Sequence, residues 1–331
     1  MTLRRKLLLV ALCTLALPVA GWLYVRQMET LLREGQAQAL VASARAVARG
    51  LVAGGAPMLG EGAGWYVEQA PNPITVDGYG DDWAPLTPWS QPLGNRGKLL
   101  LAEDRDGLYL YLEVRSGRRS RADAGDANAL AADHAILLLG KGAAQRRYLL
   151  ASAAPGPFTA RALDPPADGL PDPLNAQWQE DGSAYRIELR LPRGLDRLGL
   201  GVYDAAAGGD PMAAEVRPLR DFSPVLSGEL AQLAPENTQA RVLSPDGWLL
   251  ARSGRLEAAD GEQPGWIASL IYRSLLANRV ADAEPWAQDQ PRLDLPEVRR
   301  AHAGKPATVW RQGETRASVV LAAAVPVERQ H

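Results

Sequence analysis

The sequence predicts a mainly β protein, with a small α+β unit and an N-terminal membrane helix. Three observations predict this class. Residues 7–25 hold no charged side chain, short strand-like runs separated by Gly-containing turns recur through residues 72–215, and residues 236–331 mix strand-like with helix-like runs. A length of 331 residues leaves room for about two domains of ~150 residues behind the helix.

Composition excludes several classes of protein. The formal net charge is −2, so the chain lacks the basic surface that nucleic-acid binding needs, and no nucleic-acid partner is expected. A hydrophobic content of 47% excludes a wholly disordered chain. The single cysteine, Cys13, can form neither an intramolecular disulfide nor a thiolate zinc cage.

The N-terminal segment, residues 1–26, is predicted to be a cytoplasmic tip followed by a transmembrane helix. At ~1.5 Å per residue, the apolar run of residues 7–25 reaches about 28 Å, which is enough for the hydrocarbon core of a bilayer. Trp22 and Tyr24 lie at its far end, where amphipathic rings favour the interface. The basic cluster at residues 4–6 marks the near end as cytoplasmic, so the bulk of the chain is expected in the periplasm.

A cleaved signal peptide is the alternative interpretation of this segment. Such peptides have a shorter apolar core followed by a small-x-small cleavage site, and residues 18–21 match that site only loosely. Leu12 precedes Cys13, where a lipoprotein signal needs a small residue, so Cys13 is interpreted as an ordinary helix residue.

Residues 27–56 are predicted to form an amphipathic helix. Apolar residues recur at helical spacing from Met28 to Leu51, with charged residues mostly between them, and Gly50 and Gly54 stop the pattern. Two uses fit this pattern equally well. The apolar stripe can pair with a second copy, making the chain a homodimer through its helical segments, or it can pack on its own domain.

The middle of the chain, residues 72–215, is predicted to be an antiparallel β-sandwich. Its strand candidates alternate with turn sequences such as Asp104-Arg105-Asp106-Gly107. The candidate strands are residues 73–78, 98–103, 108–114, 133–139, 146–151, 176–179, 185–191 and 198–203.

The order of motifs in this region resembles that of family-nine carbohydrate-binding-module and DOMON-like sandwiches. The matching residues are Pro-x-x-x-Asp-Gly-x-x-Asp-Asp-Trp from Pro73 to Trp83, an Asp-His pair before an apolar strand, Trp178, and Tyr-Arg-Ile-Glu from residue 185. The sharpest part is Asp77, Gly78, Asp82 and Trp83, whose expected role is structural. Asp77 would fix the opening turn and Trp83 would fill the core.

The same resemblance implies a saccharide held between aromatic ring faces. Trp65, Trp89 and Trp178 are the candidate ligand-binding residues, although a plain core or surface position is the preferred interpretation of each. Asp133 and His134 sit at the start of a predicted strand, where turn chemistry explains both. No regular calcium-loop spacing is present, and no metal site is predicted.

The last segment, residues 236–331, is predicted to form an α+β layer. Residues 239–243 and 248–252 flank a Ser-Pro-Asp-Gly turn, residues 266–278 have helical spacing, and residues 307–310 and 318–327 are strand-like.

This segment resembles the membrane-proximal part of extracytoplasmic PAS or Cache sensor domains. The marks are the run V-L-S-P-D-G-W-L-L-A-R-S-G from Val242, the turn at Gly304 and the closing A-A-A-V-P-V. With the N-terminal run from Leu17 to Gln36, the chain is similar throughout to the input half of bacterial membrane-bound sensor histidine kinases. In such kinases the closing strand feeds a second membrane helix, a kinase core uses ATP and Mg²⁺, and a cognate response regulator is the partner.

The chain departs from that family in lacking any catalytic motif. Its histidines, His134, His302 and His331, have no phospho-acceptor context, so phosphotransfer and its cofactors would belong to a kinase core outside these residues. The chain is therefore expected to be the sensing half of a longer protein. No Gly-x-Ser-x-Gly, His-Glu-x-x-His, phosphate-loop or Cys-x-x-Cys motif occurs, and acidic pairs such as Asp81-Asp82 fit solvated turns.

Three functions follow in order of preference. The first is the extracytoplasmic signal-sensing region of a sensor histidine kinase in a bacterial inner membrane, which detects a saccharide or another envelope ligand. The second is a membrane-tethered periplasmic protein that binds a carbohydrate or a partner without signalling. The third is an anchored hydrolase.

Overall fold

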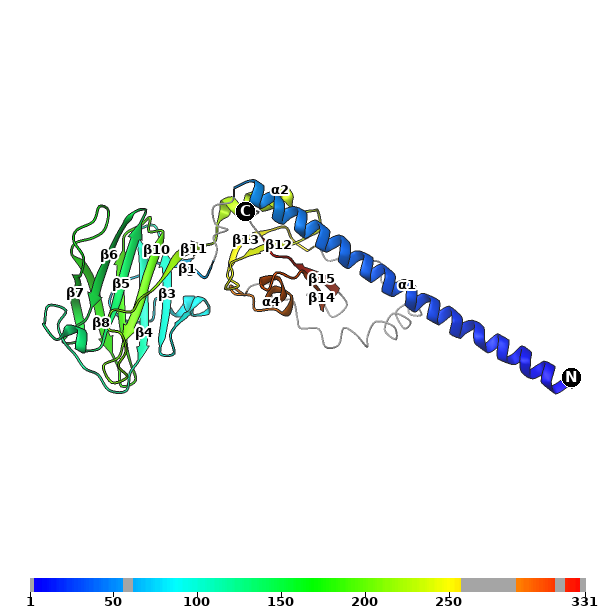
Figure 1. The fold of residues 1–331 in the computed structure, drawn as a ribbon, viewed down its shortest axis with the longest axis horizontal. Coiled ribbons are helices and arrows are strands. Elements are labelled where there is room, and N and C mark those ends of the chain that lie inside the picture. The colour runs from blue at the N-terminus through cyan, green and yellow to red at the C-terminus, as the bar shows by residue number, and fades with distance from the viewer. Residues whose placement is uncertain (1–2, 56–61, 257–289, 313–318, 328–331) are drawn as a thin grey trace.

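A computed structural model describes the backbone of residues 3–55, 62–256, 290–312 and 319–327 (Figure 1). Side chains are described for residues 20–55, 62–256, 290–311 and 320–327. The helices are α1 (Leu3–Ala53), α2 (Pro224–Leu233) and α4 (Pro296–His302), with 3-10 turns at Ala84–Trp89 and Ala129–Ala131. The strands are β1 (Trp65–Gln69), β2 (Gln91–Leu93), β3 (Gly97–Glu103), β4 (Leu108–Arg115), β5 (His134–Lys141), β6 (Ala144–Leu150), β7 (Gly156–Ala162), β8 (Leu174–Glu180), β9 (Ala184–Leu191), β10 (Arg197–Tyr203), β11 (Glu215–Asp221), β12 (Ala240–Leu243), β13 (Leu249–Ser253), β14 (Ala307–Gln312) and β15 (Val319–Ala324).

The prediction of a mainly β chain with a sandwich in its middle is confirmed. One sheet runs β2-β3-β4-β9-β8 and the facing sheet runs β11-β10-β5-β6. Strand β7 pairs with both β8 and β6, and β1 pairs with both β11 and β3, so the two sheets are joined along both edges. The pairings of β1 are parallel, which departs from the fully antiparallel sandwich predicted.

The sandwich core forms where alternate residues of the two sheets face each other. Leu110 and Leu112 of β4 and Ile187 and Leu189 of β9 are fully buried there. They meet Leu137 and Leu139 of β5 and Leu198 and Leu200 of β10, which are also fully buried. The residues that face the core alternate along each strand, as the pleat requires, and the outer faces of β4 and β5 are also largely buried, under loops that pack on them.

The strand predicted at residues 73–78 is wrong. This segment crosses the outer face of the first sheet as a loop, because its N–H groups bond to the side chains of Glu188 and Asp82 and not to a neighbouring strand. The sandwich also extends beyond residues 72–215, since β1 and β11 are part of it.

Helix α1 is continuous from Leu3 to Ala53 (Figure 1). Residues 7–19 of the predicted membrane segment lie outside the residues whose side chains are described. Among the residues whose side chains are described, no helix is both long and apolar enough to cross a bilayer.

The elements after β11 form two small units among the residues described. Strands β12 and β13 make one two-stranded sheet and β14 and β15 make another, so they do not share the single layer predicted from the sequence. The first packs with α2, and the second packs with α4 and on α1. The predicted helix at residues 266–278 lies outside the described residues.

One apolar cluster, here called the junction core, joins α1 to the sandwich. It contains Leu51 of α1, Tyr66 of β1, Leu226 and Leu230 of α2, and Trp248 with its neighbours in the β12–β13 hairpin. The rings of Tyr66 and Trp248 stack with centroids 5.1 Å apart and planes inclined by 15°. The sandwich and the long helix therefore share buried side chains.

Candidate functional site

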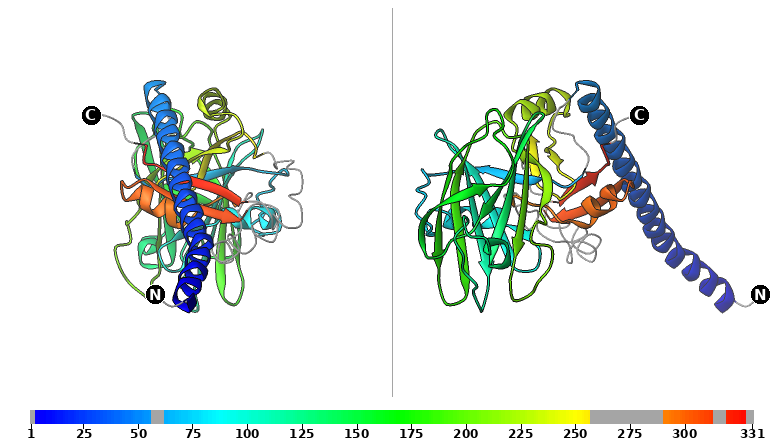
Figure 2. Two further views of the ribbon diagram at one scale, coloured as in Figure 1. Left: turned by 90° about the vertical axis from the view of Figure 1, so that its right-hand side faces the viewer. Right: turned by 60° about the vertical axis from the view of Figure 1, so that its left-hand side comes forward.

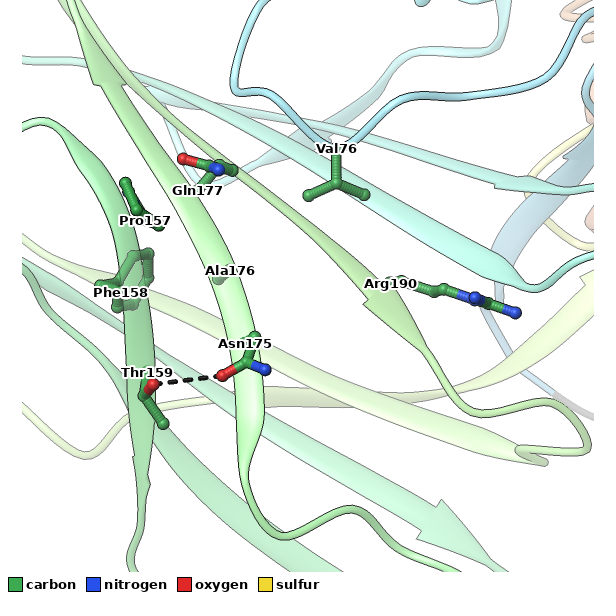
Figure 3. Close-up of a pocket in the computed structure, with 8 residues that line it drawn as sticks. All are labelled: Val76, Pro157, Phe158, Thr159, Asn175, Ala176, Gln177 and Arg190. Atoms are coloured by element: carbon green, nitrogen blue, oxygen red, sulfur yellow. Dashed lines mark hydrogen bonds between the residues drawn. The ribbon is translucent and has the colours of Figure 1, made fainter.

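A cavity of about 450 Å³ lies on the outer face of the first sheet, beside β7 and β8 (Figure 3). Its floor is strand surface and one wall is Val76, from the loop that crosses the sheet. The lining residues are Val76, Pro157, Phe158, Thr159, Asn175, Ala176, Gln177 and Arg190.

Neutral polar groups gather on one side of this cavity. The Thr159 hydroxyl donates a hydrogen bond of 3.1 Å to Oδ1 of Asn175, which leaves the amide NH₂ of Asn175 on the exposed face of β8. Gln177 lies two residues along the same strand and adds a second amide to the same face. Pro157 and Val76 supply apolar surface nearby. Amides and a hydroxyl beside apolar carbon suit a ligand that carries hydroxyl groups on a hydrocarbon ring.

Arg190 contributes its stem to the cavity more than its charge. Its guanidinium points away from the amides in Figure 3 and donates to the backbone carbonyl of Asp106. The polar side of the cavity is therefore neutral, and a neutral ligand meets no unpaired charge there.

The three tryptophans predicted to hold a ligand are not brought together. Trp65 and Trp178 have 0% and 2% of their surface exposed and belong to the sandwich core. Their indole N–H groups donate to the Leu198 carbonyl and to Glu180, respectively. Neither ring offers a free face for stacking on a sugar. Trp89 is half-buried, packs against the junction core and against a second apolar cluster under the loop that bears Val76, and is not among the residues that line the cavity.

Buried Glu188 holds the loop that forms the cavity wall. Its side chain is 0% exposed and accepts hydrogen bonds from the backbone N–H of Asp77 at 3.0 Å, the backbone N–H of Gly78 at 2.7 Å and the indole N–H of Trp83 at 2.7 Å. Burial raises the pKa of the Glu188 carboxyl above its ordinary value, and the N–H donors oppose this shift.

The motif from Asp77 to Trp83, which Glu188 anchors, therefore has a structural role. Asp77 Oδ1 accepts from the N–H of Tyr79, and Asp82 Oδ2 accepts from the N–H of Thr75. Gly78 has a φ of 85°, and an added Cβ there would lie 2.4 Å from Cγ of Gln179. Only glycine lets the loop lie this close to β8, and Val76 is thereby held over the sheet.

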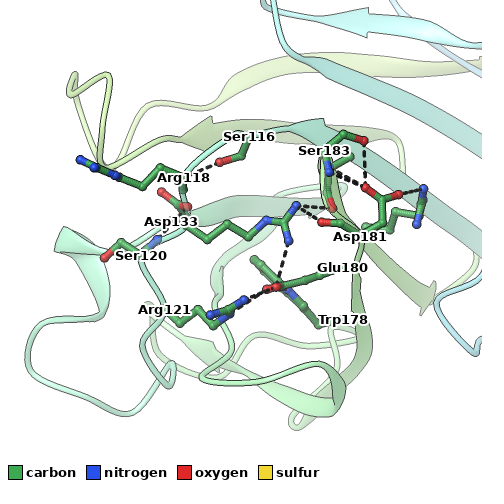
Figure 4. A network of polar contacts seen from close by, with 12 residues as sticks. Ser116, Arg118, Ser120, Arg121, Asp133, Trp178, Glu180, Asp181 and Ser183 are labelled. Atoms are coloured by element: carbon green, nitrogen blue, oxygen red, sulfur yellow. Dashed lines mark hydrogen bonds and ion pairs between the residues drawn. The ribbon is translucent and has the colours of Figure 1, made fainter.

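A second polar network fixes the other end of β8 (Figure 4). Glu180 accepts hydrogen bonds from the indole of Trp178 at 2.8 Å, from Nη1 of Arg119 at 3.0 Å and from Nε of Arg121 at 3.1 Å. Bonding by Arg121, with help from Trp178 and Arg119, lowers the pKa of Glu180 to about 2. Asp181 accepts from the N–H groups of Ser183 and Ala184 and closes the β8–β9 turn.

Asp133 and His134 have structural partners. Asp133 accepts from the N–H groups of Ser120 and Ala205, and the ring nitrogens of His134 lie 2.7 Å from the carbonyl oxygens of Ala132 and Pro211. Among the residues that the structure describes, no group of three or more His, Cys, Asp or Glu side chains could hold a metal ion.

The cavity residues were not predicted, and Glu188 entered the sequence prediction only as the last residue of the Tyr-Arg-Ile-Glu motif, with no role assigned to it. The alternation of polar Asn175, Gln177 and Gln179 with buried Ala176 and Trp178 is a signal for a polar outer strand face. Nothing in the sequence marks Glu188 as the anchor of a loop 110 residues away.

No family model matches the chain, and no curated protein matches it. The solved structures that are similar to it include two of a carbohydrate binding module family 9 from Caldicellulosiruptor kristjanssonii. The complex with glucose has a TM-score of 0.32 and 12% identity and covers 48% of this chain and 97% of that chain. The complex with cellotriose has a TM-score of 0.33 and 13% identity and covers 49% of this chain and 96% of that chain.

Proposed function

We propose that this chain is the ligand-detecting region of a receptor anchored in a bacterial inner membrane, with the sandwich in the periplasm. In this proposal the sandwich binds a neutral saccharide in the cavity beside β7 and β8. The junction core then transmits the resulting displacement to α1. The observation that carries the proposal is the junction core, because it contains side chains from both the sandwich and the long helix.

Strand β1 links the sandwich core to the junction core. Trp65 and Val67 point into the sandwich core, while Tyr66 between them points into the junction core, stacks on Trp248 and donates a hydrogen bond of 3.1 Å to the Leu249 carbonyl. Close-packed interiors transmit small displacements because they have few voids to absorb them. A shift in the sandwich that moves β1 therefore moves the packing around Leu51 of α1.

The two remaining parts of the proposal, the membrane anchor and the signalling role, are supported by the sequence alone. The uncharged run of residues 7–25 and the basic cluster before it support the anchor, and the resemblance to histidine-kinase input regions supports a kinase core and response regulator as partners. Sequencing the native gene tests the kinase proposal. A reading frame that continues into an apolar helix and a phospho-acceptor helix supports it, and a native stop codon after His331 favours a tethered binding protein.

Saccharide binding is tested by variants of the cavity amides. Asn175→Ala and Gln177→Ala each remove an amide from the polar side of the cavity. We expect each to weaken saccharide binding at least about tenfold, since an unpaired hydroxyl in the bound state costs on the order of 1–3 kcal/mol. Isothermal titration of the chain in detergent against a panel of soluble neutral oligosaccharides measures the effect.

The matched control is Gln145→Ala, which removes an exposed amide from β6 in the other sheet. It should leave the affinity unchanged. If no saccharide in the panel binds the wild-type chain, or if the control weakens binding as much as the cavity variants do, the saccharide proposal is wrong.

A further inference from the structure

A second apolar cluster lies between the first sheet and the loop that bears Val76, and it is here called the loop core. Val76 and Trp89 are half-buried and pack on it. Its buried members are Ile74, Trp83, Leu86, Leu100, Ala102, Tyr109 and Tyr111. The ring of Trp83 stacks on that of Tyr111, which belongs to β4, with centroids 5.4 Å apart. Because Val76 also lines the cavity, the cavity wall and the loop core share a side chain.

Trp89 joins the loop core to the junction core, because its side chain packs against both. Two residues later, Gln91 of β2 is 3% exposed, and its amide forms two hydrogen bonds with the backbone of Tyr66. Its Oε1 accepts from the Tyr66 N–H at 2.7 Å, and its Nε2 donates to the Tyr66 carbonyl at 2.7 Å. Tyr66 is the junction-core residue that stacks on Trp248. Packing and hydrogen bonds therefore both hold the end of the loop to the junction core.

The shared side chains form a continuous path from the cavity to α1. The path enters the loop core at Val76, crosses to the junction core at Trp89 and ends at Leu51. Figure 2, right, shows the β12–β13 hairpin (yellow), whose side chains belong to the junction core, between the sandwich and α1. Chains of packed side chains and hydrogen bonds can carry energetic coupling between distant sites. The path depends on Trp89, because among the residues whose side chains are described it alone belongs to both clusters.

We propose that Trp89, supported by Gln91, is a positioning residue that couples the cavity wall to the last turns of α1. A ligand that displaces Val76 moves the loop core, and Trp89 transfers that movement to the packing around Leu51. The coupling is reciprocal, so a change at Leu51 also shifts the cavity wall. The trigger, a bound saccharide, rests on the proposed function, whereas the contacts that carry the movement are present without it. The competing route runs through the sandwich core and β1.

Amide exchange of the full chain in detergent, without ligand, tests this coupling. Gly78→Ala displaces the loop, since Gly78 has a φ of 85° and an added Cβ would lie 2.4 Å from Cγ of Gln179. We expect this variant to speed exchange at least about threefold in residues 47–53 of α1 as well as in the loop. In a Trp89→Ala background it should still speed exchange in the loop but add nothing around Leu51. Trp89→Phe keeps an aromatic ring between the two clusters and should restore the response.

Two controls lie in the opposite sheet. Gly142→Ala strains the turn between β5 and β6, where φ is 59° and nothing lies within 4 Å of an added Cβ, so it should leave exchange in α1 unchanged. Tyr203→Ala removes a half-buried ring that stacks on His134, and it should leave the response of α1 to Gly78→Ala intact. If Gly78→Ala or Trp89→Ala does not fold, Val76→Ala and Trp89→Leu are the milder substitutes.

Two outcomes would overturn the proposal. The first is that exchange around Leu51 does not respond to Gly78→Ala in the wild-type background. The second is that the response persists undiminished in Trp89→Ala, which would favour the route through β1. Saccharide binding is measured separately by titration. Absence of binding with the α1 response intact would contradict only the proposed function, and loss of the response with binding intact would contradict only the role of Trp89.

Discussion

Replacing Glu188 with alanine is expected to lower the free energy of unfolding by about 3–5 kcal/mol. The carboxylate is fully buried and accepts hydrogen bonds from two backbone N–H groups and from the indole of Trp83. Without it, three buried donors lose their partner, and each unsatisfied group costs about 1–3 kcal/mol. Urea unfolding followed by circular dichroism measures the loss.

Two variants make this expectation specific. Glu113→Ala removes a half-buried carboxylate from the neighbouring strand β4, where it forms a 3.5 Å ion pair with Arg186, and should cost less than about 1 kcal/mol. Glu188→Gln keeps the shape and one acceptor oxygen and should fall between the two. If Glu188→Ala proves no more destabilising than Glu113→Ala, Glu188 does not anchor the loop.

Replacing Glu180 with glutamine is expected to cost about 2–3 kcal/mol near pH 7 and almost nothing near pH 2. The pKa of Glu180 is lowered to about 2 by Arg121, Trp178 and Arg119. A carboxyl whose folded-state pKa lies below its unfolded value stabilises the fold above the unfolded pKa and loses that contribution as the pH falls toward the folded one. The window of loss is therefore from about pH 5 down to about pH 2.

Urea midpoints of wild type and Glu180→Gln at several pH values test this. The difference between them should shrink steadily as the pH falls through the window. Glu215→Gln is the control, because Glu215 pairs with Arg217 at the surface with 55% of its side chain exposed and should contribute little at any pH. A difference that is constant with pH would show that the ion-pair network around Glu180 adds no charge-dependent stability.

Strands with local signals could be predicted from the sequence. The runs that became β3 and β4 flank an Asp-Arg-Asp-Gly turn, and Asp104 Oδ1 accepts from the N–H groups of Asp106 and Gly107 in that turn. Both signals, alternation and turn chemistry, lie within a few residues. The same local signals located β8 with β9 and β12 with β13.

Strands without local signals were missed. Strand β1 is short and carries Trp65 and Tyr66 side by side, and it is stabilised by parallel partners more than 30 residues away in sequence, Leu219 and Ala102 among them. Strand β7 contains Pro157, which weakens any strand pattern. Such strands depend on tertiary pairing that periodicity alone does not contain.

In the candidate site, too, features with local sequence signals could be predicted and features that depend on tertiary contacts could not. The tryptophans were chosen for their residue type, but whether a ring has a free face depends on burial, and Trp178 stacks on Tyr185 with centroids 4.5 Å apart inside the core. The amides of β8 line a cavity only because the loop that bears Val76 lies beside them, and the sequence does not show that arrangement. The motif from Asp77 to Trp83 could be recognised in the sequence and belongs to that loop. Glu188 also lies in a recognisable motif, but its contacts with the loop more than 100 residues away could not be predicted from it.

Hydrogen exchange of the full chain, with and without a bound saccharide, tests most directly whether the sandwich is coupled to α1. The account predicts slower amide exchange in β7 and β8 and also in the last turns of α1 around Leu51, and it predicts that Trp248→Ala abolishes the change in α1 while the change at the cavity remains. If exchange in the wild-type chain slows only at the cavity, the sandwich is not coupled to α1. That result would contradict the account and favour a tethered binding protein that does not signal.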